Sequence, residues 1–267
     1  MTVDVGVMPP PNDAPLPTGV QVKRKADGTL VASKPLVDLL VDARSKYDWP
    51  AGTGTAASQK RILALEANAA CLTGALDAEG AHSIVSMISR WAGNNKKAQT
   101  NIDFASPQTR AGMMTAIGRI LGPSTLKNGL DGLCALPGLR LVTATKVYRF
   151  CCPKTGAAVD RHASYFFNSL DIVDPEGIRC KGTMFKREWA KGKHKTSRLA
   201  IYNPSHHVAN RDQFVDRYLP LLAQIASSLN CMGANFRCAA TGREKSWRPA
   251  DVEMAAYHWW ARFGPKR

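Results

Sequence analysis

Apolar side chains recur at intervals of three and four residues along most of this 267-residue chain. Because an α-helix has 3.6 residues per turn, this spacing gathers them on one helical face. Ser and Asp stand where helix N-caps are expected, and Gly-Pro pairs stand where helices would end. The pattern predicts helices over 34–43, 58–72, 84–92, 107–121, 163–170, 214–229 and 249–260. We therefore expect an all-α fold.

One segment, 139–150, fits two kinds of structure. Its β-branched residues favour a strand, although its neighbours are helical in pattern. Turn signals bound it, with Leu136-Pro137-Gly138 on one side and Cys152-Pro153 on the other. The pattern leaves open whether two helices or a β-hairpin flank the first turn.

Residues 1–30 show no apolar periodicity. They contain the run Pro9-Pro10-Pro11 and the basic run Lys23-Arg24-Lys25. Such a segment buries too little apolar surface to order itself, so we expect a disordered, Pro-rich basic tail.

The charge balance narrows the class of partner. Lys and Arg number 36 against 21 Asp and Glu, a net charge of +15. A polyanion is the expected partner, and nucleic acid is the commonest one, because neutralised phosphates release counterions. An anionic membrane surface is the competing interpretation. No apolar stretch reaches the roughly 20 residues of a spanning helix, and the N-terminus lacks a signal peptide's basic start, so we expect no membrane partner and no secretion.

Much of the excess charge lies between residues 181 and 198. That stretch holds seven Lys and Arg residues and one Glu, a net charge of +6, with Phe185 and Trp189 among them. Aromatic rings between basic residues can stack on nucleotides, although they also anchor loops to a domain. The predicted phosphate contacts here are Lys186, Arg187, Lys191, Lys193 and Lys195.

Cysteine and histidine usage argues against a metal site. The seven cysteines are an odd, scattered set, which favours reduced thiols. Cys231 and Cys238 are spaced like the start of some iron–sulfur ligand runs, but no cysteine follows them. His206-His207 and Ser205 have no partner at ligand or triad spacing. We therefore expect neither a metal nor another cofactor.

Three short motifs occur in order: Leu136-Pro137-Gly138-Leu139, then Thr143-Ala144, then Val159-Asp160-Arg161-His162. Together they resemble the helix-hairpin-helix DNA glycosylases, the superfamily of endonuclease III and of the 3-methyladenine and 8-oxoguanine glycosylases. The resemblance covers about 80–170 and is specific between 133 and 165.

This resemblance implies a fold of two helical lobes with a basic loop insertion. With the basic run, it leads us to expect a helix-hairpin-helix lobe at 78–180, a basic DNA-contacting loop at 181–210, and a second lobe built from 31–77 and 211–267. The hairpin residues implied to contact DNA are Leu136, Gly138, Arg140 and Thr143.

The resemblance also implies a reaction. A DNA glycosylase extrudes a base from the duplex and hydrolyses its N-glycosidic bond, leaving an abasic site. Asp160 matches the catalytic carboxylate, which stabilises the sugar cation and orients the attacking water. His162 matches a histidine that supports it. The loop 93–97 matches the one that fills the gap left by the base, and Asn94 or Asn95 is the expected wedge.

Two positions depart from the family pattern. Arg140 replaces the hairpin's second glycine, which in relatives exposes backbone amides to a phosphate. Val142 occupies the position where bifunctional members carry the lysine that cleaves the strand. Lys146 lies one turn further on and is expected to point elsewhere. The resemblance therefore implies a monofunctional enzyme.

Two other classes of function stay open. A helix-hairpin-helix protein without catalysis would bind DNA and use Asp160 only as a helix N-cap. An RNA-binding protein would use the basic 181–198 segment. The favoured interpretation is a monomer acting on double-stranded DNA with a modified base, in the cytoplasm, the nucleoid or another DNA-containing compartment. Alkylated, oxidised, deaminated and hypermodified bases, including those of foreign DNA, all fit.

Overall fold

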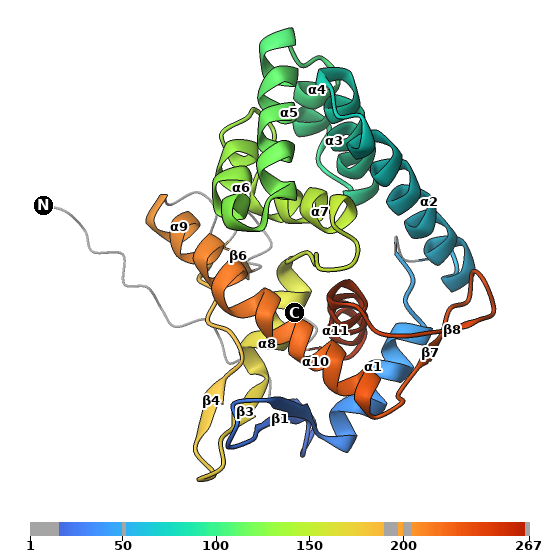
Figure 1. The fold of residues 1–267 in the computed structure, drawn as a ribbon, viewed down its shortest axis with the longest axis vertical. Coiled ribbons are helices and arrows are strands. Elements are labelled where there is room, and N and C mark those ends of the chain that lie inside the picture. Colours follow the sequence, from blue (N-terminus) through green and yellow to red (C-terminus); the bar gives the residue numbers. More distant parts are fainter. Residues whose placement is uncertain (1–15, 50–51, 190–196, 200–203, 265–267) are drawn as a thin grey trace, which may run out of the picture.

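The protein is mostly helical and its elements fall into two groups that meet near the middle of the molecule (Figure 1). The computed structural model describes residues 16–49, 52–189, 197–199 and 204–264. No helix within these ranges is long and apolar enough to cross a membrane.

The first group consists of consecutive elements from α2 to α7, drawn from teal to yellow-green in Figure 1. Within it α5 packs on α3 and α6, and α7 packs on α2 and α3. Its members are α2 (Thr55–Gly74), α3 (Ala78–Ala92), α4 (Lys96–Asp103), α5 (Pro107–Leu121), the 3-10 turn η1 (Pro123–Thr125), α6 (Leu126–Cys134) and α7 (Leu141–Cys151).

The second group is built around α11, which packs on α1, α8 and α10. The first nine residues of α11, 249–257, are all buried, including the charged residues Asp251 and Glu253. A π-helical segment, η2, joins α9 to α10, so that the three follow one another without an intervening loop. The members are α1 (Lys34–Ser45), α8 (Arg161–Ser169), α9 (Pro204–Gln213), η2 (Phe214–Tyr218), α10 (Leu219–Cys231) and α11 (Pro249–Phe263).

A small sheet at the lower edge of the molecule was not predicted (Figure 1). Its order is β2-β1-β3-β4, with β1 parallel to β3 and the other pairs antiparallel. There are also two two-stranded sheets, one formed by β5 and β6 and the other by β7 and β8. The strands are β1 (Gln21–Arg24), β2 (Leu30–Ala32), β3 (Asp171–Val173), β4 (Arg179–Lys181), β5 (Arg187–Trp189), β6 (Ser197–Leu199), β7 (Phe236–Arg237) and β8 (Glu244–Lys245).

The sheet corrects the predicted tail. Residues 16–30 are part of the fold, because Val22 and Leu30 are buried and β1 pairs with β3, a strand that is distant in the sequence. Ala32 N donates to Ser228 Oγ of α10 at 3.0 Å, which fixes β2 to the helix. Strands of three or four residues show too little alternation to stand out in a Pro-rich sequence. Residues 1–15 lie outside the described ranges.

The predicted lobe boundaries are also wrong in two places. α2 lies within 31–77 but packs with α3 and α7 of the first group, whereas α8 lies within 78–180 but packs on α11. The predicted 181–210 loop contains β5 and β6 and the start of α9. The sequence pattern shows that α2 and α8 have apolar faces, but it does not show which helices pack against those faces.

The ambiguous segment 139–150 is helical. It forms α7, and every residue of α7 except Val142 is buried. Burial on all sides outweighs the modest strand preference of its β-branched residues. The predicted helices are confirmed as helices, with shifted ends: α2 begins at Thr55 because Ser58 Oγ bonds the backbone of Trp49 instead of capping. The short helix α4 was not predicted.

Candidate active site

The turn between α6 and α7 requires glycine at one position. Gly138 has φ +84°, and a Cβ there would lie 2.7 Å from the carbonyl oxygen of Ala98 in α4. A side chain is therefore excluded both by backbone conformation and by contact. Leu136 is half-buried and packs against Gly112 of α5. The hairpin is thus held from two sides, by α4 and α5.

Arg140 fits the hairpin without the second glycine of the family motif. Its φ of −142° and ψ of 168° are extended values that any residue adopts. Its side chain is exposed, and Nη1 donates to the carbonyl of Leu139 at 3.0 Å. No described side chain caps α7. The first amides of α7 therefore form a positive helix end beside an exposed guanidinium, a combination suited to a phosphate.

Thr143 and Asn94 have structural contacts that differ from their predicted roles. Thr143 is buried, and its hydroxyl donates to Asn94 Oδ1 at 3.3 Å, so its side chain is not exposed for the contact that the sequence predicted. Asn94 Nδ2 also bonds Ser89 Oγ at 2.7 Å. These bonds join the end of α3 to α7.

Asn95 caps α4, since its Oδ1 accepts from Ala98 N at 2.9 Å. Residues 96 and 97 are therefore the first helical turn and not part of a loop, which corrects the predicted wedge loop 93–97. Both wedge candidates, Asn94 and Asn95, are held by hydrogen bonds in this structure.

Asp160 is the N-cap of α8 and is half-buried. Its Oδ1 accepts both cap bonds, from His162 N at 2.9 Å and Ala163 N at 3.0 Å. The second oxygen, Oδ2, takes part in neither bond. The carboxylate is oriented by the cap while one oxygen stays available for chemistry.

The segment before Asp160 is fixed from both groups of helices. Val159 N donates to Thr145 Oγ1 of α7 at 3.2 Å. Tyr218 Oη donates to the carbonyl of Ala158 at 2.9 Å. Both bonds are buried, so the start of α8 has little freedom to move relative to the hairpin.

Aromatic rings lie next to this carboxylate. The His162 ring meets the Tyr257 ring edge-on at 5.1 Å between centroids, and Tyr257 meets Trp49 in the same way at 5.4 Å. Burial, and then the Asp160 carboxylate, raise the pKa of Tyr257 above its ordinary value. His162 Nε2 lies 3.1 Å from the guanidinium of Arg161. The His162 ring therefore contacts Tyr257 and Arg161, while its backbone N–H donates to Asp160 Oδ1.

Lys146 does not point away from this region, which corrects the sequence-based expectation. Its Nζ lies over the rings of Trp49 and Trp91, at 5.9 and 5.6 Å from their centroids. Burial lowers its pKa, and the charge of Asp160 opposes that shift. A residue four positions after Val142 lies one turn further along nearly the same helical face.

Glu253 of α11 faces the same region and was missed. Burial raises its pKa to about 8, with Asp160 adding to the shift and Arg149 opposing it. Arg149 Nε lies 3.8 Å from Glu253 Oε2, and Arg149 Nη2 lies 3.6 Å from Glu66 of α2. A charged residue inside the apolar run 252–256 was the available signal for Glu253.

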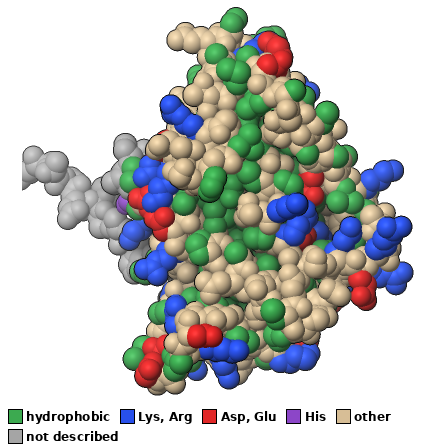
Figure 2. Space-filling model, in the orientation of Figure 1, with side chains coloured by type: hydrophobic (Ala, Val, Ile, Leu, Met, Phe, Trp, Pro, Cys, Tyr) green, Lys and Arg blue, Asp and Glu red, His purple; other side chains and the backbone are tan. Residues whose placement is uncertain are grey.

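The basic segment is only partly described. Lys186 is exposed, and its backbone is held by Asn210 through bonds of 2.7 and 3.0 Å. The backbone of Arg187 pairs with Leu199 in the β5–β6 hairpin. Lys191, Lys193 and Lys195 lie outside the described residues. Figure 2 shows hydrophobic side chains gathered along the middle of one face, with Lys and Arg toward its margins.

The remaining residues singled out in the sequence have structural surroundings. Trp247 and Trp260 are buried in the core. His207 does have a partner, because its Nε2 lies 3.3 Å from Asp131 Oδ1, which links α9 to α6. All seven cysteines are free. No group of three or more His, Cys, Asp or Glu residues suited to a metal occurs in the described ranges.

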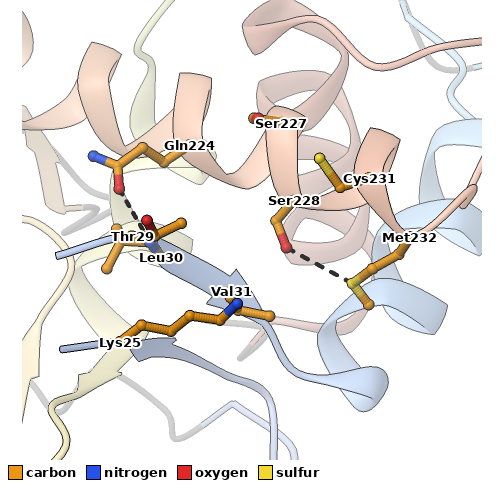
Figure 3. A pocket seen from close by; sticks show the side chains of 9 residues that line it. All are labelled: Lys25, Thr29, Leu30, Val31, Gln224, Ser227, Ser228, Cys231 and Met232. Atoms are coloured by element: carbon orange, nitrogen blue, oxygen red, sulfur yellow. Dashed lines mark hydrogen bonds between the residues drawn. The ribbon is translucent and has the colours of Figure 1, made fainter. Parts of the chain in front are cut away.

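A pocket of about 240 Å³ lies between β2 and α10, on the sheet side of the molecule (Figure 3). Lys25 and Cys231 line it, together with the apolar parts of Leu30, Val31 and Met232. It contains none of the residues around Asp160 and no carboxylate, so it does not belong to the candidate site.

Comparison of the chain with protein-family models, with curated proteins and with solved structures finds no match.

Proposed function

We propose that this protein is a monofunctional DNA glycosylase that binds double-stranded DNA, extrudes a modified base and hydrolyses its N-glycosidic bond. The observation that carries the proposal is the position of Asp160. Its half-buried carboxylate follows a glycine-dependent hairpin, and one of its two oxygens is free of the helix cap.

The hairpin supplies the means of holding the strand. The uncapped N-terminus of α7 and the exposed Arg140 offer amides and a guanidinium to one phosphate. These groups contact only backbone, so they position the duplex without reading its sequence.

Asp160 supplies the chemistry. As the glycosidic bond breaks, positive charge develops on the deoxyribose, and an adjacent carboxylate stabilises it. Oδ2 accepts a hydrogen bond from a water molecule and orients it toward C1′, and the water oxygen forms the new bond to C1′. The attacking water gives one proton to Asp160 Oδ2 as it bonds to C1′, and the departing base takes the bonding electrons together with a proton from solvent.

Val142 supports hydrolysis without strand cleavage. It is the half-buried residue at the second position of α7 and carries no amine. The next amine along α7 is that of Lys146, which lies one turn further on over the Trp49 and Trp91 rings.

A non-catalytic DNA-binding protein is the second candidate. The two amide bonds to Asp160 Oδ1 are those of an ordinary N-cap, and they account for an Asp at this position without any reaction.

The test is to incubate the protein with duplexes that each contain one alkylated, oxidised, deaminated or hypermodified base. The proposal expects mass spectrometry to detect a free base from at least one duplex, with the strand intact until alkali is added. Tight binding of every duplex without release would favour the non-catalytic candidate.

A further inference from the structure

The exposed end of α11 carries aromatic residues where a surface helix normally carries polar ones. Residues 249–257 are buried, whereas the last turns of the helix, in which Trp260 is buried, reach the surface. In these turns Trp259 is half-buried and Phe263 is 59% exposed. Their rings lie 6.1 Å apart between centroids. Exposed apolar rings that touch one another form a patch, and such patches mark sites of interaction.

The neighbouring helix α8 extends this surface. Tyr165 is half-buried, and its ring stacks on that of Trp260 at 5.5 Å with 9° between the ring planes. Phe166 meets Trp259 edge-on at 5.8 Å. The two helices pack side by side in the middle of the molecule (Figure 1). The rings of Tyr165, Trp259 and Phe263, which we call the aromatic patch, are therefore supported by the buried rings of Phe166 and Trp260.

Basic side chains border the aromatic patch. Arg161 is exposed and lies on the same face of α8 as Tyr165, because the two are four residues apart. Arg262 is exposed, and its guanidinium lies 5.7 Å from the centre of the Phe263 ring. In the sequence, residues 257–267 contain three basic residues and no acidic one, of which 265–267 lie outside the described residues. The border of the aromatic patch is therefore cationic.

Carboxylates also lie near this border, and each is held by other groups. Asp160 adds a negative charge at the start of α8, where its Oδ1 accepts the two cap bonds. Asp42 and Asp48 influence His258 of α11. Asp42 forms an ion pair at 2.5 Å with the lysine four residues on, and Asp48 accepts two hydrogen bonds from the loop that follows it. Glu253 lies deeper, in the buried part of α11.

We infer that the aromatic patch binds a single-stranded segment of nucleic acid, whose bases stack on Tyr165, Trp259 and Phe263 while its phosphates contact the bordering arginines. Every base has a flat π face, so such stacking tolerates any sequence. A guanidinium binds a phosphate through two parallel hydrogen bonds. The bases of a duplex are stacked on one another and closed to these contacts, so the ligand is a strand with unpaired bases.

The aromatic patch continues from the candidate site. Asp160 and Tyr165 belong to the same helix, about 7.5 Å apart along its axis. A strand that is opened beside Asp160 therefore continues onto the aromatic patch. Binding of a single strand requires no reaction, so it is separate from the proposed base release.

The test measures binding of a short fluorescein-labelled oligothymidylate by fluorescence anisotropy. An abasic oligomer of the same length keeps the phosphates and lacks the bases, and the wild type should bind it more weakly. Phe263→Ala should weaken binding of the oligothymidylate about fivefold to a hundredfold, the range for loss of one stacked ring, and leave binding of the abasic oligomer unchanged. A parallel series with oligouridylate shows whether DNA or RNA is the tighter ligand.

Matched variants separate stacking from folding. Phe263→Trp keeps an aromatic ring and should bind as the wild type does. Phe104→Ala removes a ring that is 83% exposed at the end of α4, outside the aromatic patch, and should also leave binding unchanged. Because most of the Phe263 ring is exposed, the melting temperature of Phe263→Ala should equal that of the wild type.

Two results would overturn the inference. One is equal affinity of the wild type for the oligothymidylate and the abasic oligomer, and the other is equal binding by Phe263→Ala and Phe104→Ala. A dimer in sedimentation velocity that Phe263→Ala converts to a monomer, with oligothymidylate binding unchanged, would assign the aromatic patch to a second copy of this chain instead. Base release from a duplex without single-strand binding would contradict the inference alone, whereas single-strand binding without base release would contradict the proposed function alone.

Discussion

Val142 and Lys146 lie one turn apart on α7. Of the two, Lys146 alone carries an amine, the group that strand cleavage requires. Lys146 is an amine with a lowered pKa in the neighbourhood of Asp160, which makes it a potential nucleophile. Its Nζ lies over the rings of Trp49 and Trp91, one turn beyond the position at which the resemblance implies a strand-cleaving lysine.

We therefore predict that borohydride traps no covalent complex between the wild type and a substrate duplex. Without an amine at C1′ no Schiff base forms, and the strand stays intact until alkali cleaves it. Denaturing gel electrophoresis of the mixture measures both effects. A trapped complex that disappears in Lys146→Met would assign lyase activity to this lysine.

Glu253 makes the stability of the protein depend on pH. Its pKa rises from an ordinary value of 4.5 to about 8 in the fold, so the folded state binds the proton more tightly than the unfolded state. The contribution of Glu253 to the free energy of unfolding is therefore fully present below pH 4.5 and is lost as pH rises toward 8.

Glu253→Gln, which stays neutral at every pH, should gain stability relative to the wild type between about pH 5 and pH 8. One pKa unit corresponds to about 1.4 kcal/mol, so the gain should reach a few kcal/mol at pH 8. Denaturant unfolding at pH 5 and pH 8 measures it. A gain that is the same at both values would show that Glu253 is ionised in the fold.

The hairpin between α6 and α7 depends on α4, a helix that the sequence did not reveal. Lys96–Asp103 has few apolar residues, and only Ile102 is buried, so hydrophobic periodicity carries little signal there. Its position is fixed by the Asn95 cap and by its contact with Gly138.

Gly138→Ala should therefore destabilise the protein by about 1 to 3 kcal/mol, from a left-handed φ together with the contact to Ala98. Thermal unfolding measures the loss. Gly118→Ala is the matched control, since Gly118 lies inside α5 with nothing within 4 Å of the added methyl, and should be neutral or slightly stabilising. Equal melting temperatures for both variants would mean that the hairpin adjusts freely.

The same elements show what a sequence can and cannot predict. Long amphipathic helices such as α3 and α5 are visible because their apolar faces repeat over four turns. The sheet is not, because β1 and β3 are short and lie far apart in the chain. Within the candidate site, the motif predicted Asp160 and His162, whereas Trp49 and Glu253 lie near them from other elements and no local pattern connects them.

Over the whole molecule, an ion pair at the start of α11 links the two groups of helices, and a buried ion pair fixes α11 to α1 within the second group. Arg248, the N-cap of α11, bonds Glu66 of α2 at 3.0 Å. Arg44 of α1 bonds Asp251 at 2.9 Å, and both side chains are buried. The two arginines hold the pKa of Asp251 low despite its burial. The site around Asp160 lies where this joint meets the hairpin.

The net charge of +15 leads to a prediction about binding. Reversing Lys191, Lys193 and Lys195 to Glu should weaken DNA binding and flatten the dependence of log K on log salt, by about one unit of slope for each phosphate that is no longer neutralised. Fluorescence anisotropy across a salt series measures the slope. An unchanged slope would mean that these lysines do not contact DNA.

The most direct test of the account is single-turnover base release by Asp160→Asn. Asn caps a helix about as well as Asp and has nearly the same size, so folding and DNA binding should be preserved. Removing the carboxylate charge should cost roughly 3 to 4 kcal/mol of transition-state stabilisation, a hundredfold to a thousandfold fall in the rate. Release at the wild-type rate by a folded, DNA-binding Asp160→Asn variant would contradict a catalytic role for Asp160 and leave it as a helix cap.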